Sequence, residues 1–245
     1  MVFCAEWEGK VEAVMGQRYK FPELSGMNRS LKIAWLVLIA TYAVGAVALF
    51  TPFRSWVLPL TPVHLVISMA LLVRHQQWKR RSAEVAARLA LVGLIAFLVE
   101  VAGVHTGKIF GVYAYLPSLG PQLWDVPLII GVNWALLAVL ALNSVPEGID
   151  RPIHRAAVAA VAMTLMDALI EKSAPFMDMW WFVDGKVPID NAIGWMLTGF
   201  VVALVLAPVV PDRGKSTERN PLTVGLWAAQ LAFFALALLA QNLVN

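Results

Sequence analysis

The chain has 245 residues, of which 60% are hydrophobic and 14% are charged, whereas soluble domains carry about 25% charged residues. This composition excludes a water-soluble globular protein and indicates an integral membrane protein. The single cysteine, Cys4, excludes an internal disulfide framework and a cysteine metal cluster. The net charge of +3 does not predict a nucleic-acid partner, because the basic residues follow a membrane-topology pattern.

The apolar segments predict an all-α integral membrane protein, a bundle of seven transmembrane helices. A helix needs about 20 apolar residues to cross a bilayer, and the N-terminal region lacks an apolar segment with a cleavage site. We expect residues 1–30 to form a cytoplasmic or interfacial arm and residues 31–245 to form a single seven-helix membrane domain. The predicted spans cover residues 32–50, 56–73, 86–105, 126–143, 154–173, 190–210 and 221–243.

The positions of the basic residues predict the orientation of this bundle. Only four of the nineteen Lys and Arg residues fall on one face of the seven-span arrangement, and the other fifteen fall on the opposite face. The positive-inside rule places the richer face in the cytoplasm, so the N-terminus is expected inside and the C-terminus outside. We therefore expect a multi-pass protein of a prokaryotic plasma membrane. The four are Arg54, Lys108, Lys172 and Lys186.

Two segments that face outward in this topology, 99–127 and 167–195, concentrate acids and aromatic residues. They contain seven of the sixteen acids, and long irregular segments in compact proteins are often functional. "VPLIIGVNW" (126–134) and "VPIDNAIGW" (187–195) also echo one another. The echo predicts parallel repeats around a shared cavity, although Pro near a helix start also has purely local causes. The seven acids are Glu100, Asp125, Asp167, Glu171, Asp178, Asp184 and Asp190.

Asp167 and Glu171 are the strongest candidates for catalysis. They stand at i and i+4, on one face of a helix, where a mid-bilayer charge costs at least about 2.5–3.5 kcal/mol. Two carboxyl groups so close in a poorly hydrated site do not easily both ionise, so one is expected to keep a proton for acid catalysis. The alternative is structural, with Glu171 paired to Lys172 and Asp167 bonded to a neighbouring helix.

Glu100 lies at a similar depth, five residues before His105, and the same two interpretations apply to it. His105 is either an interfacial hydrogen-bonding group or a partner that orients a carboxylate or water. His64 is interpreted as a helix-packing residue. Aromatic residues among the acids predict stabilisation of a passing carbocation through their π faces, although aromatic belts are ordinary at membrane interfaces. These aromatics are Tyr113, Tyr115, Trp180 and Trp181.

Motifs for other functions are missing. The last predicted span contains no Lys for a retinal Schiff base, and the chain has no phosphate-binding, dinucleotide-binding or zinc motif. The Asp167 and Glu171 pair faintly resembles the Asp-rich motifs of membrane prenyltransferases, which use two motifs where this chain has one. A terpenoid cyclase or prenyltransferase, and an isoprenoid or proton-coupled transporter, remain alternatives.

An ordered set of motifs runs through residues 95–200. It consists of Glu100, Gly103, "FGVYAY" (110–115), "LGP" (119–121), Val126, Pro127 and Trp134, then Trp180, Trp181, Pro188, Asn191, Gly194 and Trp195. This set resembles the carotenoid biosynthesis family of membrane hydratases, the CruF type. The chain departs from the family pattern in three places: Ile109 replaces a Pro, Asp125 replaces a Gly, and 182–184 replaces a Gly-rich stretch.

The resemblance implies a cofactor-independent enzyme that adds water across the terminal 1,2 double bond of an acyclic (ψ) carotenoid end, giving a tertiary alcohol. Its partners would be a lycopene-like carotenoid, water, membrane lipid and other carotenoid-pathway enzymes, with no metal and no nucleic acid. We expect Asp167 or Glu100 to donate the proton, and Glu171 and His105 to tune the donor or activate water. The expected substrate-binding residues are Tyr113, Tyr115, Trp180 and Trp181 at the cation, Asp190 and Asn191 at the water, and Phe110 and Trp195.

Overall fold

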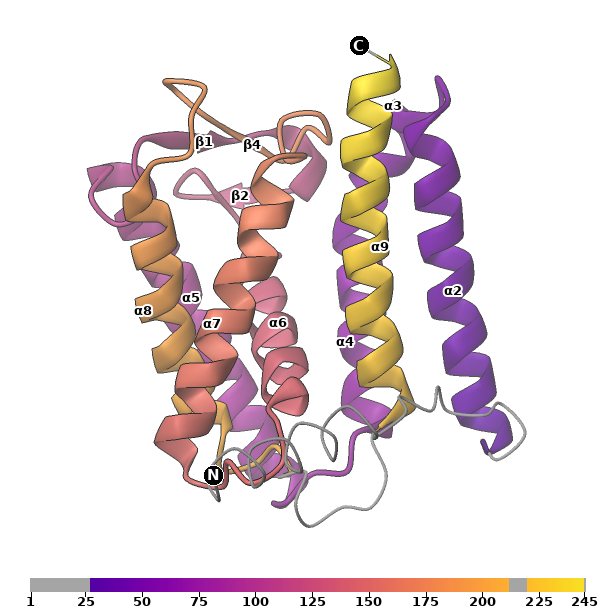
Figure 1. Ribbon diagram of the computed structural model, residues 1–245, viewed down its shortest axis with the longest axis vertical. Coiled ribbons are helices and arrows are strands. Elements are labelled where there is room, and N and C mark those ends of the chain that lie inside the picture. Colours follow the sequence, from indigo (N-terminus) through magenta and orange to yellow (C-terminus); the bar gives the residue numbers. More distant parts are fainter. Residues whose placement is uncertain (1–26, 212–219, 245) are drawn as a thin grey trace, which may run out of the picture.

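A computed structural model describes residues 27–211 and 220–244 (Figure 1). Most of the expected N-terminal arm, with Cys4, lies outside the described residues. The same is true of six of the basic residues that predicted the topology: Lys10, Arg18, Lys20, Arg213, Lys215 and Arg219.

Within the described residues, six helices are long and apolar enough to cross a membrane, so the protein is a multi-pass membrane protein. A seventh apolar helix, α6 (Ile130–Ser144), has 15 residues, or about 22 Å at 1.5 Å per residue, short of the ~30 Å hydrocarbon core. Every side chain from Trp134 to Leu142 is buried in protein, so the length of α6 is not set by lipid. The six are α2 (Arg29–Leu49), α3 with α4 (Arg54–His75), α5 (Ser82–Thr106), α7 (Pro152–Glu171), α8 (Ile189–Leu206) and α9 (Pro221–Val244).

Local sequence explains where several helices begin and end. The Asn28 side chain caps α2 by accepting a hydrogen bond of 2.9 Å from the Leu31 amide. The second span is divided into α3 (Arg54–Val57), a 3-10 turn (Leu58–Leu60) and α4 (Thr61–His75), because Pro59 and Pro62 lack amide hydrogens. Helix α5 ends at Gly107, whose φ of +63° suits glycine at a C-terminal cap.

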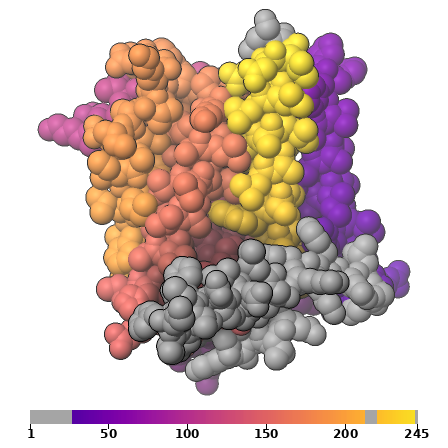
Figure 2. Space-filling view, viewed as in Figure 1, coloured from indigo at the N-terminus to yellow at the C-terminus, as the bar shows by residue number. Residues whose placement is uncertain are grey.

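The helices form two groups that lie side by side (Figure 1). Helices α5, α6, α7 and α8 make one group, in which α6 packs against the other three. Helices α2, α4 and α9 make the second group, and α6 also contacts α4 and α9. The side chains of α7 and α9 meet on the face shown in Figure 2. Helix α6 is therefore the centre of the bundle.

In the part of the chain that the structure describes, four short strands lie together at one end of the bundle, which we call the strand end (Figure 1). Strand β1 (Tyr113–Tyr115) pairs antiparallel with β4 (Trp180–Phe182), and β2 (Gln122–Leu123) pairs with β3 (Val126–Pro127). These strands are a local addition to the predicted all-α fold. The β2–β3 turn gives Trp124 and Asp125 φ values of +52° and +61°, as a type I′ turn requires. The Gly that the family pattern has at position 125 would adopt the same positive φ, so the replacement by Asp125 is compatible with this turn.

Two contacts fix neighbouring helices at the opposite end and in the middle of the bundle. Arg155 of α7 is buried and donates hydrogen bonds to the carbonyl oxygens of Ala207, Val210 and Pro211, at 3.0, 3.0 and 2.8 Å. It thereby satisfies carbonyl groups after α8 that the helix itself leaves free. Helices α5 and α6 approach closely at Gly93 and Gly131, where a Cβ atom on Gly131 would lie 2.7 Å from the Gly93 oxygen.

Candidate functional site

The carboxyl group of Glu100 is buried on α5 and accepts three hydrogen bonds. Tyr113 and Tyr115 donate their hydroxyls to Oε2, the latter at 2.8 Å, and Trp134 donates its indole N–H to Oε1 at 2.9 Å. Burial, together with the Glu100 carboxyl group, raises the pKa of both Tyr113 and Tyr115. Both hydroxyls therefore remain donors at neutral pH, and they hold Glu100 in one orientation.

A second carboxyl site lies on α7, where Asp167 and Glu171 are both buried. The amide of Asn191 on α8 donates one hydrogen bond to Asp167 at 2.8 Å and another to Glu171 at 3.1 Å. Trp180 donates its indole N–H to the other oxygen of Glu171 at 2.8 Å. The Oδ1 atom of Asp167 is buried without a hydrogen-bond partner, so this pair is less fully satisfied than Glu100.

Strand pairing brings the two carboxyl sites together. In the β1–β4 ladder, Tyr115 stands opposite Trp180 and Tyr113 stands opposite Phe182. The Tyr115 and Trp180 rings meet edge to face at 6.1 Å. Tyr115, which donates a hydrogen bond to Glu100, thus contacts Trp180, which donates one to Glu171. The contact links α5 and α7, which are far apart in sequence.

The two echoed tryptophans also meet at the site. Trp134 of α6 and Trp195 of α8 stack with centroids 4.0 Å apart and planes inclined by 20°. Phe110 packs beside Trp134 and against Gly103 of α5 and Gly194 of α8. The sequence echo therefore corresponds to a direct contact between α6 and α8.

A small cavity of about 20 Å³ lies between the two carboxyl sites. A polar space of at least about 10–15 Å³ can hold one water molecule, and the polar groups around this one suit water. It is lined by Glu100, Phe110, Tyr113, Tyr115, Ile130, Asn133, Trp134, Glu171, Trp180, Phe182, Asn191 and Trp195.

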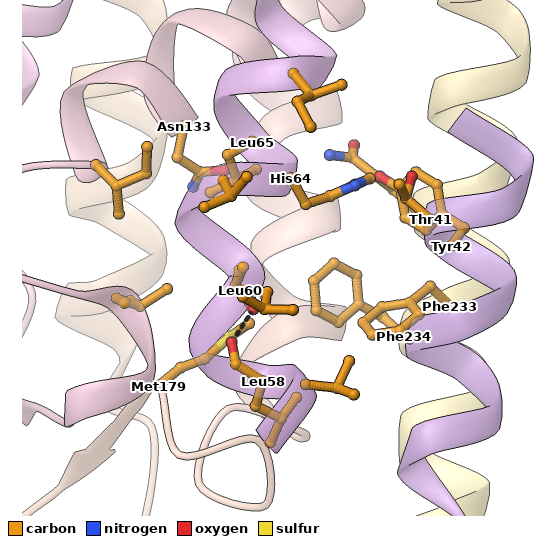
Figure 3. A pocket seen from close by; sticks show the side chains of 18 of the residues that line it. Thr41, Tyr42, Leu58, Leu60, His64, Leu65, Asn133, Met179, Phe233 and Phe234 are labelled. Carbon is orange, nitrogen blue, oxygen red and sulfur yellow. Dashed lines mark hydrogen bonds between the residues drawn. The ribbon is translucent and has the colours of Figure 1, made fainter. Parts of the chain in front are cut away.

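A larger, mostly apolar cavity of about 360 Å³ adjoins it, between the two helix groups (Figure 3). Ile130, Asn133 and Trp180 line both cavities. The remaining wall comes mainly from α2, α4 and α9, including Tyr42, His64 and Phe233. Its volume falls in the range of about 300–1,000 Å³ that is usual for ligand pockets.

The structure does not bring every expected site residue to these cavities. His105 is half exposed, its Nε2 atom lies 3.8 Å from Asp125 Oδ2, and it lines neither cavity. The Trp181 side chain is 43% exposed, and Asp190 is also exposed.

Sequence reasoning did not assign a role to Trp134 or Asn133. Trp134 contacts Glu100 directly, and Asn133 borders both cavities. The sequence contained a signal for both, because Asn133 and Trp134 end the "VPLIIGVNW" segment (126–134). The matching segment "VPIDNAIGW" (187–195) ends at Trp195, which was predicted to bind substrate. Among the residues that the structure describes, no group of three or more His, Cys, Asp or Glu side chains is placed to hold a metal ion.

Comparison with known proteins gives a family match and a curated relative. The sequence model of the family described as "Carotenoid biosynthesis protein" matches residues 56–245. The chain is also 31% identical over 132 residues to the bisanhydrobacterioruberin hydratase of Haloarcula japonica. That match covers 49% of this chain and 44% of the relative, so the chain spans less than half of the relative's length. No solved structure matches.

Proposed function

The chain belongs to the family of carotenoid biosynthesis proteins, and from this premise we propose that it is a membrane-embedded carotenoid hydratase. It adds water across the terminal 1,2 C=C bond of an acyclic (ψ) carotenoid end and gives a tertiary alcohol. The hydratase name of the relative supports this class of reaction.

One observation carries the proposal. A cavity large enough for one water molecule lies between two buried carboxyl sites and adjoins a larger apolar cavity. The larger cavity suits a hydrocarbon end, and Trp180 and Asn133 stand where the two spaces meet. An alkene at that boundary would have water on one side and buried carboxyl groups within reach.

The proposed reaction needs one proton donor and one acceptor. The Asp167 and Glu171 pair, bridged by the single Asn191 amide, holds one proton, because two adjacent buried carboxyl groups do not easily both ionise. Glu171 gives this proton to the alkene carbon C2, and the positive charge forms at the tertiary carbon C1. The π face of Trp180 stabilises that cation.

Water then completes the reaction. A water molecule in the small cavity forms a C–O bond at C1 and loses a proton to Glu100. Hydrogen bonds from Tyr113, Tyr115 and Trp134 hold Glu100 in place. A proton must afterwards return from Glu100 to the donor pair, so that only water is consumed.

The test is expression of this chain in a bacterium that accumulates lycopene. The extracted pigments are separated by chromatography, and their masses are measured by mass spectrometry. We expect a product heavier by one water with unchanged chromophore absorption, because the terminal C=C bond is not conjugated. Glu100→Gln and Glu171→Gln should each reduce conversion by at least about 100-fold, the usual scale of acid–base catalysis. Full activity in both variants, with protein confirmed in the membrane, would refute the assignment.

A further inference from the structure

Asn133 of α6 stands where the two cavities meet. Ile130, Asn133 and Leu137 lie on one face of the helix, at i, i+3 and i+7, and all three line the larger cavity. Ile130 and Asn133 line the small cavity as well. Figure 3 shows the Asn133 carboxamide among the side chains around the larger cavity. The next residue, Trp134, donates its hydrogen bond to Glu100, so α6 contacts the carboxyl site and the boundary of the cavities with successive residues.

The carboxamide of Asn133 is free to hold a ligand. It makes no hydrogen bond with any residue in the described part of the chain, and its oxygen and nitrogen both remain accessible on a half-buried side chain. The other polar side chain that lines both cavities, Trp180, is already bonded to Glu171. Asn191, the second amide of the small cavity, donates hydrogen bonds to both acids of α7.

A water molecule in the small cavity needs more than one polar partner. An ionised carboxyl group has about four acceptor positions, and three hydrogen bonds already reach Glu100. One position is therefore left for one hydrogen of the water. A water molecule held inside a protein makes about two to four hydrogen bonds, and the Asn133 oxygen is available to accept its other hydrogen.

We propose that Asn133 positions the attacking water molecule through its Oδ1 atom, an assignment that rests on the proposed hydratase function. With one hydrogen directed to Glu100 and the other to Asn133, the water presents its oxygen lone pairs to C1 of the polyene in the larger cavity. The oxygen forms the C–O bond at C1, one O–H bond breaks, and that proton passes to Glu100. Asn133 exchanges no proton and acts as a positioning residue.

Loss of this hydrogen bond separates formation of the cation from its capture. Glu171 still protonates C2, but the cation at C1 is not attacked by water. The cation then loses a hydrogen from C2 or from a methyl carbon on C1 to the Glu171 carboxylate, which restores a C=C bond. In D₂O the donor pair carries deuterium, so this unproductive cycle leaves deuterium in the recovered polyene. The ratio of deuterated polyene to alcohol therefore measures how often capture fails.

The experiment uses isolated membranes that contain the chain, supplied with lycopene in detergent micelles and D₂O buffer. Mass spectrometry measures deuterium in the polyene and the amount of alcohol. Asn133→Leu keeps the size of the side chain and removes its polar atoms, so hydration should fall about 10- to 100-fold and the ratio should rise by at least about tenfold. The KM for lycopene should change by less than about twofold. Asn133→Asp keeps an acceptor oxygen at the same place and should restore the ratio.

Asn143→Leu is the matched control, because it makes the same substitution on the same helix at a residue that lines neither cavity. The Asn143 carboxamide accepts a hydrogen bond from Gln76 and donates one to the Val139 oxygen. The control should therefore lower the unfolding temperature and leave the ratio unchanged.

An unchanged ratio in folded Asn133→Leu would overturn the proposal. Loss of alcohol and deuterium together would also overturn it, because Asn133 would then act in folding or in proton transfer. If Asn133→Leu does not fold, Asn133→Val carries the same test. Alcohol formation with an unchanged ratio leaves the hydratase proposal standing, whereas neither alcohol nor deuterium from the unmodified chain refutes both proposals.

Discussion

Gly131→Ala tests whether the close approach of α5 and α6 sets the geometry of the site. The added Cβ atom would lie 2.7 Å from the Gly93 oxygen and 3.1 Å from its carbonyl carbon. These are backbone atoms, which cannot rotate away as a side chain can. The two helices must separate for the methyl group to fit.

The size of the effect follows from these distances. Ordinary contact begins near 3.4 Å, so relief requires a separation of about 0.7 Å, the kind of backbone shift that overpacking causes. If α6 moves by this amount away from α5, the 2.9 Å hydrogen bond from Trp134 to Glu100 lengthens to about 3.6 Å and ceases to be a hydrogen bond. We expect a loss of about 1–3 kcal/mol in stability and of up to about 100-fold in hydration rate.

The assay combines thermal unfolding in detergent with pigment conversion in lycopene-accumulating cells. Gly199→Ala is the control, because its Cβ would meet Ala160 at an ordinary 3.5 Å and alanine favours a helix by about 1 kcal/mol. The reasoning is refuted if the two variants have equal stability and equal activity.

Three further predictions concern single side chains. Asn191→Leu removes the donor to both Asp167 and Glu171, so it should cost at least about 2 kcal/mol in unfolding free energy and slow hydration, as thermal scans and pigment conversion would measure. Arg155→Met leaves three carbonyl groups after α8 without their donor and should cost at least about 3 kcal/mol, seen as a lower unfolding temperature in detergent. Lys186→Ala changes an exposed residue outside both cavities, so conversion should stay at the unmodified level; a large loss would place Lys186 in the site.

The positions of the helices were largely predictable from the sequence, since the lengths of apolar segments follow bilayer thickness. The predicted span 86–105 agrees with α5 (Ser82–Thr106), and 154–173 agrees with α7 (Pro152–Glu171). The fourth predicted span shortens to α6 because protein, rather than lipid, surrounds it. Its apolar sequence cannot distinguish these two environments.

The arrangement of side chains within the site was less predictable, because small rotations decide it. His105 follows Glu100 by five residues, which is about 140° around the helix, so the two point in different directions. Trp180 and Trp181 were treated alike, but successive strand residues face opposite sides, and Phe182 joins Trp180 at the small cavity instead. Trp134 reaches Glu100 only through the packing of α5 on α6, which neither segment reveals alone.

Phe110 has a consequence for how this family can change over evolutionary time. Its ring occupies a socket in which a Cβ atom on Gly103 would lie 2.7 Å away and one on Gly194 would lie 2.6 Å away. A substitution at Gly103 is therefore blocked by the ring, while one at Gly194 is blocked both by the ring and by the Ile109 backbone oxygen, 2.5 Å from the added Cβ. Loss of the ring leaves a void between α5 and α8. Positions 103 and 110 should covary among relatives, with a larger residue at 103 accompanied by a smaller one at 110, while position 194 should stay glycine.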